Sequence, residues 1–293
     1  MPNSRTHDGA GTAPPLSQAV RKMVALIDVD VRQSERLLGL CFLLGSAPTP
    51  SYAEQEPLFA ELEDLLMDAD NELVRTVMED RRFQAIRRRL RLVRAQYEYE
   101  RELVLARQVT AVGDDSPIKE FRAGDWYDLI HNYEIQALAP YHPKNILLVG
   151  SGSYPTTAFS LLRADPNVKV TCIDRDGLAC QLSIELSLIC GVDRLRVIWS
   201  DILDLHDLAQ YDCIILACVA GVHDIEKDDI VQHVISRSSA QTLLALRTAC
   251  GAGRIMYPSV DLSRLDGFDY RVLKDPPQKT VTMILAHRIA LAS

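Results

Sequence analysis

The stretch Lys144–Pro155, KNILLVGSGSYP, decides the fold of this chain. An apolar run ends at Gly150-Ser151-Gly152, and the segment 156–164, TTAFSLLRA, follows with the composition of a helix. Glycines at a strand-to-helix turn let the backbone approach a ligand closely. The N-terminus of the following helix favours a negatively charged group. The stretch therefore predicts the first strand–turn–helix unit of a Rossmann-like sheet, with a ligand at the turn.

Similar apolar runs recur along the C-terminal half of the chain. They predict strands at 145–150, 168–174, 195–201 and 213–220, separated by helices at 156–164, 178–191 and 231–251. Apolar strands that alternate with helices indicate a parallel sheet covered on both faces. The closing stretch 268–289, FDYRVLKDPPQKTVTMILAHRI, predicts two strands joined by a proline-containing turn. These two strands would form an antiparallel edge of the sheet.

The N-terminal half has a different pattern. Residues 1–15 are small, polar or Pro/Gly, which predicts a disordered tail. Helical spacing of apolar residues then begins, first at 19–27 and again at 58–66. Residues 47–57 are expected to be a proline-bounded loop, and 81–107 one long helix with a solvated basic face. We therefore predict an α/β protein with a helical-bundle domain at 16–120 and a Rossmann-like domain at 121–293.

The composition of the chain excludes several classes of function. The chain has 293 residues, 47% of them hydrophobic, and a net charge of -8, which argues against non-specific nucleic-acid binding. Its seven cysteines form no CxxC pair, as expected for reduced thiols in the cytoplasm. No apolar run reaches the roughly 18 residues of a membrane span. The histidines His142, His223 and His287 are too dispersed for a metal site. We expect a cytoplasmic protein without a metal, a membrane or a nucleic-acid partner; a homodimer is left open.

Three features of the strand ends favour S-adenosylmethionine over a dinucleotide as the ligand. The turn lacks the third glycine of GxGxxG, and Pro155 stands where a pyrophosphate would need room. Asp174 ends the second strand, where an acid binds ribose hydroxyls, and Asp201 ends the third, near the expected adenine. Either aspartate alone could be a helix cap. Together they predict a bound S-adenosylmethionine, which would serve as co-substrate.

From about residue 50 onward, the order of four segments is informative. They read PLFAELEDLL (57–66), NYEIQALAPYHPKNILLVGSG (132–152), ILACVAGV (215–222) and LRTACGAGRIMYPSVDLSRLDGFDY (246–270). In this order they resemble the nicotianamine synthase family, which includes bacterial enzymes that make opine-type metallophores. The resemblance implies transfer of the 3-amino-3-carboxypropyl arm of S-adenosylmethionine, with release of methylthioadenosine. With the strand ends described above, we expect cofactor contacts from Gly150, Ser151, Gly152, Tyr154, Asp174, Asp201 and Ala217.

The resemblance also implies catalytic residues. Tyr133 matches the tyrosine of the family's Asn-Tyr motif, with Asn132 beside it facing the substrate, and Glu102 best matches a glutamate of the long helix. Glu98 takes that place if the helix register is shifted by one turn. A carboxylate or phenol near an attacking amine can accept its proton. Glu98 and Glu102 are four residues apart and share a helix face, so both could instead pair with helix arginines.

Substrate recognition is expected from the last of these four segments, 246–270. Arg247 follows an apolar run, and a buried arginine there would pair with a substrate carboxylate or with an aspartate of the sheet. Tyr257 matches the family's Tyr-Pro and is expected to face the cavity. Arg254 is displaced from the family's second arginine, which falls on Gly253 here. Tyr154 departs from the family's aliphatic residue, and its ring could sit against the sulfonium.

Several reactions remain open at this point. The first is attack by the amine of an amino acid, which would yield a nicotianamine-like or opine metallophore. The second needs no further substrate: the cofactor's own amine would close a four-membered ring and give azetidine-2-carboxylate. A methyltransferase and a non-catalytic binding protein on the same scaffold are the remaining alternatives.

Overall fold

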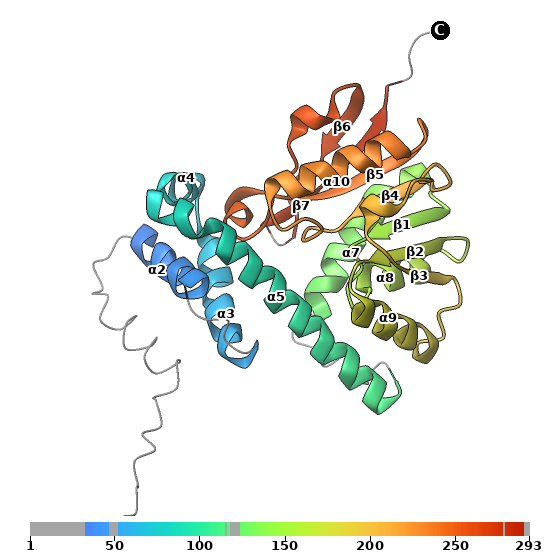
Figure 1. The fold of residues 1–293 in the computed structure, drawn as a ribbon, viewed down its shortest axis with the longest axis horizontal. Coiled ribbons are helices and arrows are strands. Elements are labelled where there is room, and N and C mark those ends of the chain that lie inside the picture. The colour runs from blue at the N-terminus through green and yellow to red at the C-terminus, as the bar shows by residue number, and fades with distance from the viewer. Residues whose placement is uncertain (1–32, 47–51, 115, 118–123, 278, 290–293) are drawn as a thin grey trace, which may run out of the picture.

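The computed structural model describes residues 33–46, 52–114, 116–117, 124–277 and 279–289 (Figure 1). The expected tail at 1–15 and the helix expected around 19–27 lie outside these ranges. The expected domain boundary near residue 120 also falls on residues that the structure does not describe. Within the described ranges, helices alone occupy the chain before residue 145, and the sheet lies after it.

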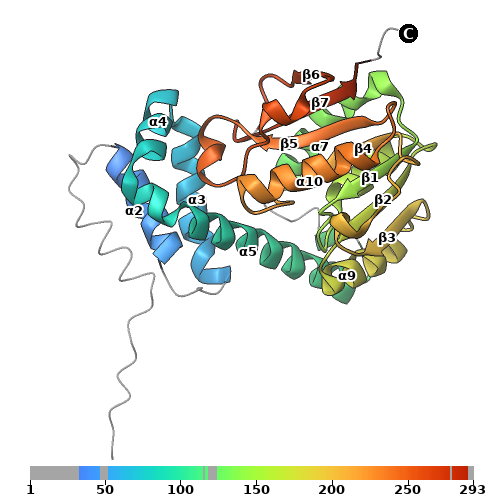
Figure 2. The ribbon, with the colours of Figure 1, turned by 45° about the horizontal axis from the view of Figure 1, so that its top comes forward.

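Helices make up the described N-terminal part, and Figures 1 and 2 show the first three gathered at one end of the molecule while the last and longest extends from them along the sheet. They are α2 (Gln33–Ser46), α3 (Tyr52–Asp68), α4 (Asn71–Glu79) and α5 (Arg81–Val112). The side chains of Asp70 and Asp80 cap α4 and α5 by accepting hydrogen bonds from backbone N–H groups. Their apolar faces bury a common core around Leu44, Phe59 and Phe83.

The loop expected at 47–57 is too long, because α3 already begins at Tyr52 and contains Pro57. Proline inside a helix removes the hydrogen bond to the carbonyl four residues earlier. Here that residue is Ala53, and both Ala53 and Pro57 are exposed, so water can take the place of the missing donor.

The long helix α5 confirms the helix predicted at 81–107, and Gly113 ends it in a left-handed conformation with φ of 81°. The prediction that the basic face of this helix is solvated is only partly confirmed. Arg91 and Arg94 are each 3% exposed, because acids from other elements cover them. Arg91 pairs with Asp224, and Arg94 pairs with Glu63 and with Glu98 one turn along the helix.

The C-terminal part is a seven-stranded sheet in the order β3-β2-β1-β4-β5-β7-β6. The first five strands are parallel, and β7 runs antiparallel to both of its neighbours. The strands are β1 (Asn145–Val149), β2 (Lys169–Asp174), β3 (Leu195–Trp199), β4 (Cys213–Leu216), β5 (Leu243–Ala249), β6 (Phe268–Val272) and β7 (Val281–Arg288). The helices are α7 (Gly124–Leu138), α8 (Thr156–Ala164), α9 (Gly177–Ile189) and α10 (Asp224–Arg237). Short 3-10 turns are η1 (Ala139–Tyr141), η2 (Ile202–Asp204), η3 (Gly251–Ile255) and η4 (Leu262–Leu265).

The two faces of the sheet bury separate apolar clusters. Val231 and Val234 of α10 cover one face, while Leu138 of α7 and Leu161 and Leu162 of α8 cover the other. Figure 2 shows α10 lying across the strands on its side of the sheet. The α/β fold class, Rossmann-like behind an N-terminal set of helices, is confirmed, as is the antiparallel C-terminal pair.

The helix expected at 231–251 is wrong in its second half. The helix α10 ends at Arg237, and the apolar run that follows is the interior strand β5. A short apolar run has the same composition in a buried strand as in a buried helix, so periodicity alone could not separate them. The polar residues 238–242 are the break that the sequence does offer.

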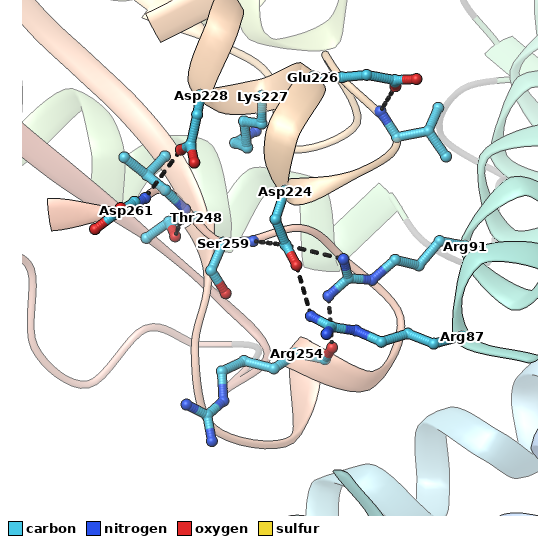
Figure 3. A network of polar contacts seen from close by, with 12 residues as sticks. Arg87, Arg91, Asp224, Glu226, Lys227, Asp228, Thr248, Arg254, Ser259 and Asp261 are labelled. Atoms are coloured by element: carbon cyan, nitrogen blue, oxygen red, sulfur yellow. Dashed lines mark hydrogen bonds and ion pairs between the residues drawn. The ribbon is translucent and has the colours of Figure 1, made fainter. Parts of the chain in front are cut away.

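An ion-pair cluster joins α5 to the sheet (Figure 3). Arg87 and Arg91 of α5 both donate to the carboxylate of Asp224, at 2.7 and 2.9 Å. The same carboxylate accepts the backbone N–H of Ser259 at 3.0 Å. Arg91 also donates to the backbone carbonyl of Arg254 at 2.9 Å. The first turn of α10 is therefore tied to the helical part of the chain.

Candidate active site

A cavity of about 420 Å³ lies between the carboxyl ends of the parallel strands and helices α3 and α5. Ligands of open α/β sheets bind at this edge. The sheet side contributes the turns after β1 and β4 and one residue of β5. The helical side contributes aromatic, acidic and basic groups. Of the residues expected in the site, those on its wall are Glu98, Glu102, Gly150, Ser151, Tyr154, Ala217, Arg247 and Tyr257.

The turn after β1 has the backbone that its glycines predict. Gly150 and Gly152 adopt φ of 75° and 70°, a region that other residues rarely occupy. Asp174 braces this turn, since its carboxylate accepts the N–H of Gly152 at 2.9 Å and that of Asp176 at 3.0 Å. Asp174 thus fixes the loop from behind and is not itself on the cavity wall.

Tyr154 lies on the cavity wall but is also part of the core. The residue is 5% exposed. Its ring and that of Phe159 pack in a T-shaped arrangement, with 5.9 Å between the ring centres and an interplanar angle of 73°. Leu103 of α5 and Leu182 of α9 belong to the same apolar cluster. The ring therefore anchors the cofactor loop to two helices, and its expected contact with a sulfonium stays a prediction.

Glu102 projects from α5 onto the glycine turn. A Cβ placed on Gly152 would lie 2.0 Å from Oε2 of Glu102, so the carboxyl group fills the space beside the backbone. Its pKa is raised to about 8, first by burial and then by the negative charge of Glu98, although the backbone N–H of Ser153 opposes the shift. Near neutral pH the Glu102 carboxyl is therefore mostly protonated.

Glu98 has the opposite electrostatic environment. Burial alone would raise its pKa, but the charges of Arg94 and Arg101 and a hydrogen bond from Tyr257 outweigh it and lower the pKa. The hydroxyl of Tyr257 donates to Glu98 at 2.6 Å, and Nε of Arg94 donates to the same oxygen at 2.9 Å. One helix face thus holds an ionised and a protonated carboxyl side by side, a division typical of acid–base sites.

Arg94 is the centre of a cage that sequence reasoning did not identify. Its guanidinium lies 5.1 Å from the ring centre of Phe59, 5.4 Å from that of Tyr97 and 5.2 Å from that of Tyr257. It also pairs with Glu63 at 2.6 Å. Contacts with ring faces and carboxylates stabilise a buried guanidinium. The sequence does contain one indication of this cage: Arg94 and Glu98 are four residues apart, so both lie on the face of α5 that lines the cavity.

Arg247 reaches the cavity from β5, and its partly buried guanidinium is paired with a carboxylate. Its Nε and Nη2 donate to the two carboxylate oxygens of Glu134 at 2.7 and 2.6 Å. Nη2 also donates to Oγ1 of Thr157 at 2.8 Å. The protein partner of Arg247 is therefore a glutamate of α7, and the expected aspartate of the sheet does not take this place.

His131 lines the cavity next to this pair and was not expected there. Its ring nitrogens lie within hydrogen-bond distance of the hydroxyls of Thr156, Thr157 and Ser160. Its pKa is lowered to about 3, chiefly by burial and further by the charge of Arg247, so the imidazole is neutral.

Asn132 and Tyr133 do not reach the cavity. Asn132 is exposed, and the hydroxyl of Tyr133 donates to the backbone carbonyl of Lys274 at 2.6 Å. Their neighbours His131 and Glu134 are buried instead, together with Leu138. These three positions, spaced by three and four residues, form one face of α7. The helical spacing was therefore the signal that could have found His131 and Glu134.

Two further candidates lie away from the wall. Asp201 caps the 3-10 turn η2 by accepting the N–H of Leu203 at 3.0 Å, which was the alternative considered for it. Arg254 is exposed, and its backbone carbonyl is its contact with α5. The cofactor contact predicted for Asp201 stays a prediction.

The described residues contain no group of three or more His, Cys, Asp or Glu side chains that could hold a metal ion. None of the described helices is both long and apolar enough to cross a membrane.

Nicotianamine synthases of plants are among the curated proteins that this chain resembles. A nicotianamine synthase from Solanum lycopersicum is 26% identical over 195 residues, which cover 61% of this chain and 60% of that protein. Nicotianamine synthase 1 from Arabidopsis thaliana is 29% identical over 150 residues, 50% of this chain and 47% of that protein. The matched segments thus span about half to three fifths of these relatives' length.

Solved structures share the fold. The crystal structure of MtNAS in complex with MTA and tNA has a TM-score of 0.70 at 19% identity, covering 95% of this chain and 100% of that one. That of a mutant of MtNAS in complex with S-adenosylmethionine has a TM-score of 0.72 at 20% identity, covering 87% and 96%. The family model described as nicotianamine synthase protein matches residues 42–292. This match extends over most of the chain, which therefore belongs to the nicotianamine synthase family.

Proposed function

We propose that the chain transfers the 3-amino-3-carboxypropyl arm of S-adenosylmethionine to an amine and releases methylthioadenosine. The observation that carries the proposal is that one cavity contains both the glycine turn after β1 and the carboxyl pair Glu98 and Glu102. A turn of this kind suits a nucleoside-bearing ligand, and a carboxyl pair suits proton transfer from an amine. The family and the ligands of the MtNAS crystal structures support the same substrate.

Glu102 is the residue we propose as the proton acceptor. The amine lone pair attacks the γ-carbon, the carbon–sulfur bond breaks, and its electron pair leaves on sulfur as the neutral thioether. The amine must lose a proton in this reaction. A base with a pKa of about 8 is better matched to an ammonium group than an ordinary carboxylate is. The positive sulfonium would in turn favour ionised Glu102.

The other wall residues have separate proposed roles. Glu98, ionised and held by Arg94 and Tyr257, would attract the positively charged groups of both substrates. Arg247 would bind a carboxylate of the aminocarboxypropyl arm while Glu134 holds it in place. Asp201, Asn132 and Tyr133 could join only if binding moved them relative to the cavity.

An amine from a second molecule fits the cavity better than the cofactor's own amine. The cavity extends beyond the strand ends to Tyr52, Glu63 and Tyr97 of the helical part, which leaves room next to a bound nucleoside. Polar and aromatic groups in that part suit an amino-acid acceptor. We therefore propose a nicotianamine-like or opine product, with the function of a metallophore.

Mass spectrometry of the purified chain with S-adenosylmethionine and mixed amino acids tests the proposal. Methylthioadenosine together with an amino acid enlarged by the aminocarboxypropyl group is the expected result. Azetidine-2-carboxylate formed without any added amino acid would establish cyclisation instead. Formation of S-adenosylhomocysteine would identify a methyltransferase. If calorimetry showed no binding of S-adenosylmethionine, aminocarboxypropyl transfer, cyclisation and methyl transfer would all be refuted.

A further inference from the structure

The loop after β4 is held by a buried lysine that the proposed reaction does not use. The side chain of Lys227, from α10, is 0% exposed. Its Nζ donates to the backbone carbonyls of Ala217 at 3.0 Å, Cys218 at 2.8 Å and Ala220 at 3.5 Å. A single ammonium group thus binds three carbonyls of one short loop.

The acids nearest to Lys227 along α10 are engaged elsewhere (Figure 3). Asp224 binds Arg87 and Arg91. Glu226 accepts the N–H of Val222, and Asp228 accepts that of Asp261. Burial lowers the pKa of Lys227 to about 8, so the group is still mainly an ammonium at neutral pH. A buried cation without a carboxylate partner is costly, and such groups usually serve a purpose.

The loop is also fitted closely to α10. Gly221 has φ of 80°, and a Cβ there would lie 2.7 Å from the backbone nitrogen of Lys227. On its other side, Ala217 and Ala220 contact Gly150 of the cofactor loop, at 3.4 and 3.1 Å from a Cβ built there. The position of Lys227 therefore controls a loop that forms part of the cavity wall.

The hydrogen bonds to Lys227 fix how the peptide units of this loop are turned. The described chain has no cis peptide bond, and in a trans peptide the N–H points opposite to the C=O. With the carbonyls of Ala217 and Cys218 bound to Lys227, the N–H groups of Cys218 and Val219 point away from it. Both residues line the cavity. Within the described residues neither N–H donates a hydrogen bond, whereas those of Ala217 and Ala220 do.

A cationic side chain from the neighbouring strand lines the same cavity as these two donors. Strands β4 and β5 pair in parallel with Leu216 opposite Leu246, so Arg247 follows beside Ala217. Two backbone N–H groups and a guanidinium at one strand edge suit a carboxylate.

We infer that Lys227 is a positioning residue, which turns the N–H groups of Cys218 and Val219 into the cavity to receive, with Arg247, the carboxylate of the aminocarboxypropyl arm. This inference rests on the proposed binding of S-adenosylmethionine. The carboxylate would fix the arm with its γ-carbon directed to the side of the cavity that holds Glu98 and Glu102.

Two ligands that differ in the arm test the inference. S-adenosylmethionine carries the carboxylate, and methylthioadenosine has the same nucleoside without the arm. In Lys227→Met, calorimetry should show S-adenosylmethionine bound about 10- to 100-fold more weakly, the usual effect of losing hydrogen bonds to a charged group. Methylthioadenosine should bind within about twofold of wild type. Lys169→Met, which removes an exposed lysine at the start of β2, is the matched control and should change neither affinity.

If Lys227→Met weakened the binding of both ligands equally, the inference would be overturned, since the loop would then contribute to nucleoside binding or to the stability of the fold. No weakening of either ligand would overturn it as well. If wild type bound neither ligand, the proposed function itself would fail, which the wild-type titration alone reveals.

A measurement on the unaltered protein covers the case in which the variant does not fold. In protein labelled with ¹⁵N at cysteine and valine, the amide protons of Cys218 and Val219 should move downfield on addition of S-adenosylmethionine. Methylthioadenosine should leave them nearly unchanged. Equal shifts with the two ligands, or none, would contradict the assignment of these donors to the carboxylate.

Discussion

The carboxyl group of Glu102 occupies the space that a side chain at residue 152 would need, because Oε2 lies 2.0 Å from the position of a Cβ on Gly152. The long helix α5 and the glycine turn after β1 are thus fitted to each other. The contact brings a carboxyl group whose pKa is raised to about 8 to the loop that is expected to bind the cofactor. The helical part of the chain is therefore part of the site as well as a support for the sheet.

The first prediction concerns this contact. Gly152→Ala should weaken S-adenosylmethionine binding at least about tenfold, since either the turn or Glu102 must move. The left-handed φ of 70° adds backbone strain of about 1–2 kcal/mol. Isothermal titration calorimetry and thermal unfolding together measure both effects.

The variant Gly191→Ala is a control that separates the effect of backbone strain from that of the contact with Glu102. Gly191 has φ of 63°, but nothing lies within 4 Å of a Cβ placed there. This variant should lose similar stability and keep wild-type affinity for S-adenosylmethionine. If it lost affinity as Gly152→Ala does, the contact with Glu102 would not be the cause.

The second prediction is a pH dependence of the reaction. If Glu102 accepts the proton, the rate at saturating substrate rises as pH passes through the pKa of this group, about 8 in the free protein. Glu102→Gln should lower kcat by about 10²- to 10⁴-fold and remove this rise. Steady-state rates of methylthioadenosine release between pH 6 and 9 provide the measurement, and an unchanged profile in the variant would exclude Glu102 as the base.

Glu98→Gln should move the same profile in a defined direction. The charge of Glu98 helps to raise the pKa of Glu102, so its removal lowers that pKa. The rising limb of the rate profile should then shift to lower pH. A shift to higher pH would mean that the two carboxyls are not coupled as described.

The third prediction concerns stability. The folded-state pKa of Glu102 is raised from 4.5 to about 8, so the group stabilises the fold fully below pH 4.5 and loses this contribution as pH rises through 8. Glutamine resembles the protonated carboxyl and does not titrate. The stability of Glu102→Gln relative to wild type should therefore grow by about 1.4 kcal/mol per pH unit across this window. Urea unfolding at pH 5 and pH 8 measures it, and a constant difference would contradict a raised pKa.

The fourth prediction separates structure from binding at Arg247. Glu134→Ala should destabilise the fold by up to about 3–5 kcal/mol, because it leaves a largely buried guanidinium without its carboxylate. The double variant Glu134→Met with Arg247→Met should recover most of that stability. It should still bind S-adenosylmethionine at least tenfold more weakly than wild type if Arg247 holds its carboxylate. Recovery of affinity along with stability would show that the pair is structural only.

Much of the sheet could be predicted from the sequence. The strands β1 to β4 are apolar runs closed by glycine, aspartate or a polar turn, and the C-terminal pair is marked by its prolines. The strand β5 was missed because its residues LLAL have no alternation when both faces are buried, so a helix was equally consistent. The position of β7 between β5 and β6 depends on long-range pairing, which no local pattern encodes.

The site was predictable where one segment supplies it, as in the turn at Gly150. It was less so where side chains meet from distant elements. Glu134 pairs with Arg247 and Lys227 binds the loop at Ala217, and each contact requires the three-dimensional arrangement of the sheet. The Asn-Tyr motif indicated the right helix, but the buried face of α7 carries His131 and Glu134 instead, and of these two His131 lines the cavity.

The central claim is that the bond broken in S-adenosylmethionine is the one between sulfur and the aminocarboxypropyl arm. Mass spectrometry with S-adenosylmethionine labelled either in the methyl group or in the four-carbon arm tests this claim most directly. We predict that the methyl label leaves with methylthioadenosine and that the arm label appears in an enlarged amino acid. A methyl label found on the acceptor, with the arm retained in S-adenosylhomocysteine, would contradict it.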